Sequence, residues 1–168
     1  EVADSIPYGL KNGGLGDTYK SWSATGTLNY NLDDIAITSV TNYNWNRNIF
    51  RIDANAVAAS PIGLYATENT SYQAFSNETR LLSRFSSPVN LMLGTLYQWT
   101  KRDYGAWTAQ AGLENSAASP SFYRYVGNSK DSRTKGETVA LFGQVIWKVV
   151  PQVEIAGAGF LNITLSAR

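Results

Sequence analysis

The stretch Ser21–Tyr30 reads SWSATGTLNY and alternates polar and apolar side chains without a break. Its apolar positions begin at Trp22 and end at Tyr30, so an aromatic residue stands at each end. Period two is the pattern of a β-strand with one wet and one apolar face. At about 3.3 Å per residue and a tilt of about 40°, the two rings are expected roughly 20 Å apart along a membrane normal. This length favours a membrane-spanning strand over the shorter strands of soluble sandwiches.

Composition narrows the classes of function. A chain of 168 residues with a net charge of +1 is one ordinary domain, and the charge does not favour nucleic acid or another polyanion as a partner. The sequence has no cysteine and no histidine, which excludes disulfide frameworks, thiol nucleophiles, Cys/His zinc sites and His-based triads. We therefore expect neither an enzyme nor a bound cofactor. Abundant tyrosine and few charges suit a transmembrane barrel, and equally a carbohydrate-binding sandwich.

The alternating segments come in pairs. We predict hairpins at about residues 21–50, 72–104 and 138–160, each closed by a short turn rich in Asp, Asn, Ser or Pro. Two long loops are predicted between the hairpins, at 51–70 and 105–136, where proline and glycine mark irregular backbone. The short turns then lie at one end of the sheet and the long loops at the other. Outer-membrane barrels have this arrangement.

The second hairpin separates charged from apolar residues. Glu78, Arg80 and Arg84 share one face of the outgoing strand, whereas the returning strand carries a stripe that includes Leu93 and Trp99. We expect the charges to face a polar lumen and the leucines and aromatics to face lipid. The three charged residues are candidates for lining a substrate path, although most charges in a lumen only pair with neighbours.

Aromatic residues also gather in the predicted loops. They form a candidate surface for gripping a chelate or a sugar, and the alternative is ordinary packing within the loops. The residues concerned are Tyr65, Trp107, Phe122, Tyr123, Arg124 and Tyr125.

Several short motifs resemble a known family. Residues 77–83 (NETRLLS), followed by a proline-containing turn and residues 93–97 (LGTLY), resemble the E-x-R-L-x-S … G-x-x-Y hairpin of TonB-dependent outer-membrane receptors. Residues 140–144 (ALFGQ) and 150–157 (VPQVEIAG) are similar to the A-x-F-G-Q … L-x-x-G hairpin of that family. Residues 37–41 (ITSVT) resemble its I-T-S-x-T strand.

The resemblance covers about residues 21–160 and implies the architecture. It implies an all-β chain, an antiparallel up-and-down meander of about six to eight long strands from a 22-stranded transmembrane barrel, which in isolation is an open curved sheet. After Gly157 the usual Arg-Tyr pair of the family is replaced by Ala158-Gly159-Phe160-Leu161. The plug and the N-terminal box that contacts TonB are also absent, so residues 1–168 are expected to be a partial barrel domain.

For the whole receptor, the resemblance implies active uptake of a bulky nutrient, such as a ferric siderophore, cobalamin or an oligosaccharide. Its location is the outer membrane of a Gram-negative bacterium, and its partners are outer-membrane lipid, the nutrient and the TonB complex, which acts through the plug and N-terminal box. The chain would contribute wall and two extracellular loops only.

Two other classes of protein stay open at this point. One is a complete eight-stranded outer-membrane barrel with a structural or adhesive role, which needs closing strands before Ser21 and after Phe160. The other is a soluble carbohydrate-binding sandwich, in which the stripes of Trp22 and Leu93 meet in one core.

Overall fold

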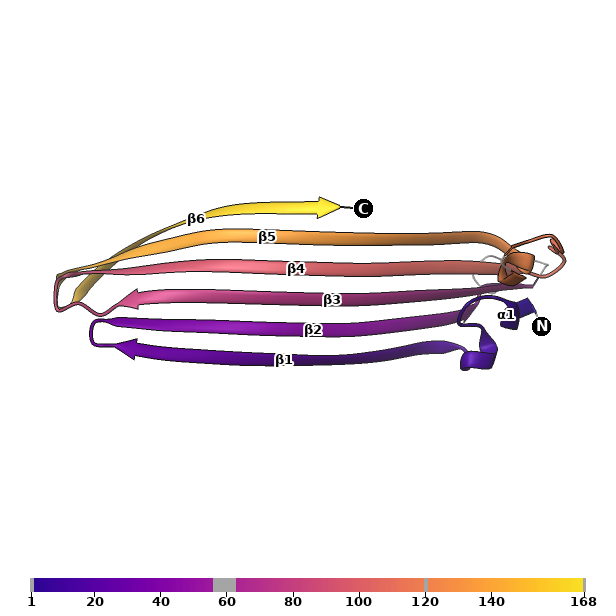
Figure 1. The fold of residues 1–168 in the computed structure, drawn as a ribbon, viewed down its shortest axis with the longest axis horizontal. Coiled ribbons are helices and arrows are strands. Elements are labelled where there is room, and N and C mark those ends of the chain that lie inside the picture. The colour runs from indigo at the N-terminus through magenta and orange to yellow at the C-terminus, as the bar shows by residue number, and fades with distance from the viewer. Residues whose placement is uncertain (1, 56–62, 120, 168) are drawn as a thin grey trace.

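The computed structural model describes residues 2–55, 63–119 and 121–167. It is a single antiparallel sheet in which each strand pairs with the next along the chain (Figure 1). The predicted all-β up-and-down meander is therefore confirmed, with six strands. The strands are β1 (Gly16–Leu32), β2 (Ile35–Asp53), β3 (Leu64–Ser83), β4 (Val89–Gln110), β5 (Val126–Val150) and β6 (Val153–Ala167).

The sheet is open. Strands β1 and β6 lie at its two opposite edges, and they do not pair with each other in the described part of the chain (Figure 1). The three tight turns lie at one end of the sheet and the two longer connections at the other. Neighbouring turns are tied together, since Arg84 N donates to Asp34 O (2.7 Å) and Lys148 N donates to Pro88 O (2.8 Å).

Within the residues that the structure describes, short helical pieces lie at the loop end. These pieces are α1 (Val2–Ser5) and two 3₁₀ helices, Leu10–Asn12 and Ser121–Tyr125. Among the described residues, no helix has the length and apolar character that a helical membrane crossing requires.

The strands are longer than the sequence indicates, so the predicted loops at 51–70 and 105–136 are wrong over about half of their length. Residues 64–70 belong to β3, 105–110 to β4 and 126–136 to β5. The tract 130–135 has no apolar alternation, yet every residue in it pairs with β4. Backbone pairing with an already long neighbour satisfies these N–H and C=O groups whatever the side chains. The tail likewise continues β6.

The strand register defines two faces. Apart from irregularities at Thr108/Ala109 and Lys148/Val150, even-numbered residues of β1 and odd-numbered residues of β2 to β6 share one side, which we call the apolar face. All five tryptophans lie on it. Many of its large apolar residues on β1, β4, β5 and β6 are exposed, with Leu93 at 58% and Leu141 at 53%. Glu78 and Arg80 lie on the opposite, polar face, as predicted.

An aromatic row crosses the apolar face. Trp22 pairs with Trp45, and in the adjacent row Phe75 pairs with Tyr43 on one side and Trp99 on the other. The rings of Trp22 and Tyr43 are 5.2 Å apart. We call these five residues the aromatic row. Between this row and the tight turns the face is rich in Leu, Ile and Val, and beyond it charged residues appear.

Glycines admit close ring contacts within the sheet. At Gly94, an added Cβ would lie 2.2 Å from the ring of Phe142 on the next strand. We expect Gly94→Val to lower the free energy of unfolding by about 1–3 kcal/mol, because the ring must leave its rotamer. Urea unfolding measures this loss. Gly157→Val is the control, since nothing lies within 4 Å of its added Cβ; equal losses in the two variants would refute the contact argument.

Candidate functional site

Two of the aromatic candidates do not lie in loops. Tyr65 belongs to β3 and Trp107 to β4, and each is only 7% exposed. The prediction that they lie in long loops is therefore wrong, because β3 and β4 extend into the segments predicted to be loops. Both side chains are on the apolar face, at the end of the sheet remote from the tight turns.

Tyr65 and Trp107 form a small core with Ile6 and Ala109. The N-terminal segment, residues 2–12, closes over this core. It is held by hydrogen bonds from Arg51 Nε to Tyr8 O (2.7 Å) and from Thr67 Oγ1 to Pro7 O (3.0 Å). Burial raises the pKa of the Tyr65 hydroxyl, which has no hydrogen-bond partner. Tyr65 and Trp107 thus contribute to a small buried core.

The remaining loop candidates lie in the 3₁₀ helix between β4 and β5. Tyr123 and Tyr125 pack partly buried against the small core. Arg124 is half exposed, forms an ion pair with Glu114 and lies 5.6 Å from the ring centre of Tyr125. The side chain of Phe122 lies outside the described part of the structure. Arg124 is therefore the loop candidate most open to a ligand.

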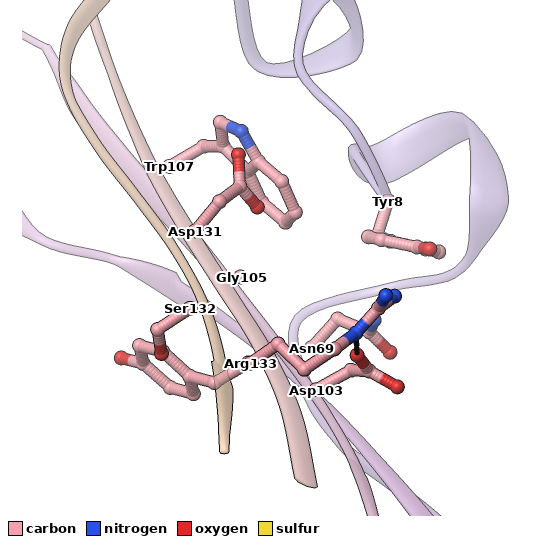
Figure 2. Close-up of a pocket in the computed structure, with 9 residues that line it drawn as sticks. Tyr8, Asn69, Asp103, Gly105, Trp107, Asp131, Ser132 and Arg133 are labelled. Atoms are coloured by element: carbon pink, nitrogen blue, oxygen red, sulfur yellow. Dashed lines mark hydrogen bonds and ion pairs between the residues drawn. The ribbon is translucent and has the colours of Figure 1, made fainter. Parts of the chain in front are cut away.

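A pocket of about 410 Å³ opens beside the small core (Figure 2). Figure 2 shows Trp107 and Asp131 on one side, Tyr8 on the other, and Asn69, Asp103 and Arg133 at the base. The rings of Tyr8 and Trp107 are 5.9 Å apart. A Cβ at Gly105 would lie 2.3 Å from the indole, so only glycine lets the ring lie this close to the strand.

An ion-pair network borders this pocket. Asp103 accepts from Arg133 Nε at 2.5 Å and contacts Lys101 Nζ at 3.0 Å. These two cations, Arg133 first, hold the pKa of the Asp103 carboxyl below its usual value. Because the network is partly exposed, solvent screening limits its contribution to about 0.2–1 kcal/mol.

Acid should remove this contribution. The depressed pKa of Asp103 means that the folded state favours the carboxylate, so the stabilisation is complete above the unfolded pKa of about 3.9 and is lost as pH falls through the lower folded value. We expect Asp103→Asn to be slightly less stable than the parent at neutral pH and equal to it in strong acid. Urea unfolding across pH measures this. A gap that persists below both pKa values would refute the ion-pair argument.

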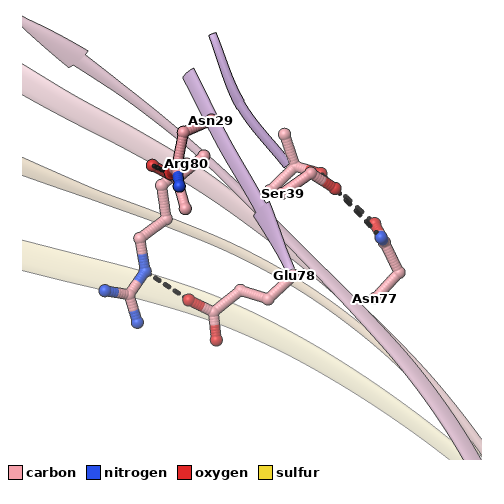
Figure 3. A network of polar contacts seen from close by, with 7 residues as sticks. Asn29, Ser39, Asn77, Glu78 and Arg80 are labelled. Atoms are coloured by element: carbon pink, nitrogen blue, oxygen red, sulfur yellow. Dashed lines mark hydrogen bonds and ion pairs between the residues drawn. The ribbon is translucent and has the colours of Figure 1, made fainter. Parts of the chain in front are cut away.

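The charged candidates of the second hairpin lie elsewhere. Glu78 and Arg80 form an ion pair on the polar face (Figure 3), beside a shallow depression of about 300 Å³ lined also by Thr38 and Leu96. They are therefore on the opposite side of the sheet from Tyr65 and Trp107. Arg84 follows the end of β3 and is exposed among the tight turns. The structure does not gather the predicted residues into one site.

A polar network interrupts the apolar face. Asn77 Nδ2 donates to Ser39 Oγ at 3.1 Å (Figure 3). It also donates to Thr41 Oγ1 (2.8 Å), and Asn77 Oδ1 accepts from Thr79 Oγ1 (3.2 Å). Both amide protons and the amide oxygen of Asn77 find partners within the network, so the face can lose water there without leaving this amide unsatisfied.

Sequence reasoning missed the pocket. Tyr8, Asn69, Asp103 and Arg133 come from four distant segments, and only the register of β3, β4 and β5 brings the last three together. Within the described residues, no cluster of three acidic side chains could hold a metal ion. A search of protein-family models and of curated proteins found no match to this sequence.

Proposed function

We propose that this chain is a wall segment of a TonB-dependent outer-membrane receptor that takes up a bulky nutrient such as a ferric siderophore. The observation that carries the proposal is a band of apolar side chains on one face of a long antiparallel sheet, exposed on β1, β4, β5 and β6. Exposed apolar surface of this extent marks contact with lipid or protein.

The height of the band matches a membrane. On β1, β2 and β4 the aromatic row stands ten residues from the tight-turn end, from Trp22 to Leu32, Trp45 to Ile35 and Trp99 to Val89. At about 3.3 Å per residue and a tilt of about 40°, ten residues rise roughly 25 Å, the height of the apolar band in outer-membrane barrels.

The strand lengths fit the same frame. Spanning a bilayer takes about 9–11 tilted residues, whereas β4 has 22 and β5 has 25. The surplus lies beyond the aromatic row, on the side of the longer connections. In the proposed orientation this half projects outside the cell and carries the N-terminal segment, the pocket and Arg124.

The open edges and the motifs favour a large parent barrel. Strands β1 and β6 each leave an edge that invites pairing with a further strand, and a 22-stranded barrel supplies such neighbours. In this frame the polar face, with Glu78 and Arg80, lines the lumen. The TonB complex acts through the plug and N-terminal box, so the chain forms wall and does not itself transport.

The two rivals find less support. A sandwich requires the stripes of Trp22 and Leu93 to meet in a core, but both lie on the same face of one sheet, 53% and 58% exposed. A small closed barrel requires strands on both sides of residues 21–160. In the described chain, residues 2–12 form no strand and residues 161–167 belong to β6, which does not pair with β1.

The coding DNA on both sides of this segment tests the proposal. We expect the frame to continue upstream into a plug with a TonB box, and downstream into further alternating strands. Disrupting the gene should then abolish growth on one iron chelate or similar nutrient under limitation. A signal peptide directly before Glu1 together with a stop codon after Arg168 would overturn the receptor proposal in favour of the small barrel.

A further inference from the structure

We propose that basic residues just beyond the aromatic row bind the anionic headgroup of a membrane lipid. This inference rests on the proposed function, because it requires the apolar face to contact lipid. We call these residues the cationic row, and they come from four strands: Lys20, Arg47, Lys101, Arg133 and Lys135.

The register aligns the cationic row across the sheet. Lys20 pairs with Arg47, and Arg47 lies in one transverse line with Ser71, Asp103 and Arg133. Lys101 and Lys135 pair in the adjacent line. Lys20, Arg47 and Lys101 each stand two residues from a tryptophan of the aromatic row and on the same face. Lys101 and Lys135 share the transverse line of Trp22 and Trp45, so the charges lie at the rim of the apolar band, where headgroups meet water.

Positive charge exceeds negative charge there. Within the described part of these two lines, Asp103 is the only acid, and it already contacts Lys101 and Arg133. Glu137 and Asp131 lie in the flanking lines, and Glu137 accepts a hydrogen bond from Tyr97 Oη (2.9 Å). Arg47 donates to Asn69 Oδ1 (2.8 Å) and lies over the ring of Tyr8. One carboxylate for five cations leaves the row electropositive.

Like charges also face each other directly. Lys101 is opposite Lys135, and Lys20 is opposite Arg47. Such cross-strand pairs destabilise a sheet unless a counter-ion lies between them. Lys20 and Lys135 are exposed, and Arg133 is 62% exposed. A phosphate group bridging these side chains would relieve the repulsion and form charge-assisted hydrogen bonds.

The surroundings favour a lipid over a soluble anion. Directly below the row lie the exposed aromatic and aliphatic side chains that acyl chains would cover. Lysine and arginine at such a rim extend their charged ends to the headgroup level, and each basic residue near an anionic surface strengthens membrane attachment. The ligand class is therefore an amphiphile whose phosphate carries net negative charge.

Tryptophan fluorescence in vesicles provides the test. In one full-length chain only Trp99, next to the row, is kept, and in a second only Trp147, near the opposite rim; the other tryptophans become phenylalanine. Each chain is folded into phosphatidylcholine vesicles with a fixed share of brominated phosphatidylglycerol or brominated phosphatidylcholine. We expect the anionic lipid to be preferred severalfold at Trp99 and not at Trp147.

Variants that remove lysine charges test whether the cationic row causes the preference for anionic lipid. K101Q/K135Q should abolish the severalfold preference at Trp99, and should still fold in phosphatidylcholine because it removes a repulsive pair. K130Q/K148Q, with the same charge change on the polar face, should leave the preference intact.

The outcomes separate the two proposals. Equal quenching of Trp99 by both brominated lipids would overturn the headgroup site and leave the membrane wall standing. No quenching by either lipid, from a chain whose circular dichroism shows the β-sheet content of the structure, would overturn the membrane wall as well. Loss of the preference when inorganic phosphate replaces chloride at constant ionic strength would assign the row to a small soluble anion instead.

Discussion

Replacing Leu93 with arginine is expected to weaken folding into phosphatidylcholine vesicles by about 2–4 kcal/mol. Leu93 is 58% exposed and lies near the middle of the apolar band, between Val89 and Trp99. A charge at the midplane of the lipid-facing side of a barrel costs this much. Adding Val145→Arg on β5 should roughly double the loss and prevent insertion. Urea unfolding in vesicles, followed by tryptophan fluorescence, measures both.

Leu96→Arg is the matched control. Leu96 lies on the same strand but on the polar face, directly opposite Glu78, so the introduced guanidinium finds water and a carboxylate. We expect little loss. An equal penalty at both positions would mean that the two faces do not differ in environment, which would contradict a lipid-facing side.

Trp107→Ala is expected to cost about 3–5 kcal/mol in the stability of the loop end. The indole is 7% exposed, contacts Tyr8 and completes the small core with Ile6 and Tyr65, and truncating a buried tryptophan forfeits this packing. Because the N-terminal segment packs on this core, the protection of its backbone amides against hydrogen exchange should also fall. Hydrogen exchange of residues 2–12, together with urea unfolding, measures the change.

Two controls sharpen this expectation. Trp107→Phe keeps most of the packing and removes an N–H that has no hydrogen-bond partner, so it should cost less than about 1.5 kcal/mol. Trp147→Ala lies near the tight turns and should leave residues 2–12 protected. Unchanged exchange of this segment in Trp107→Ala would show that the small core does not hold it.

The part of the sheet between the aromatic row and the tight turns is predictable from the sequence, because polar and apolar residues alternate along its strands. Residues 21–30 and the stripe of Leu93 to Trp99 show period two, and the tight turns carry turn-forming residues, so strand number, order and faces were predictable. Glu78 and Arg80 were placed correctly on the face opposite the leucines for the same reason.

The outer half of the sheet was not predictable, because its strands lack that signal. The tract 130–135 reads KDSRTK and is exposed throughout, so neither face selects apolar residues. Long-range pairing, not local preference, decides such segments. The sequence consequently predicts loops at Tyr65 and Trp107, whereas in the structure the Trp107 ring lies over Gly105, two residues earlier on the same face of β4.

The candidate sites depend on register even more strongly. Asp103 and Arg133 are thirty positions apart in sequence, and they meet only because β4 and β5 pair in one particular register. The same register places Lys101 opposite Lys135. A shift of one residue would move these side chains to the other face. Composition alone does not contain that information.

Site-directed spin labelling along β4 tests the central claim most directly, because the chain has no cysteine and each label is introduced singly. In vesicles, labels at odd positions from Val89 to Trp99 should be accessible to membrane-dissolved oxygen, and labels at even positions to a water-soluble nickel complex. Beyond Thr100 the oxygen preference should disappear. Odd positions that are shielded from both reagents, or open to the nickel complex, would contradict a lipid-facing wall.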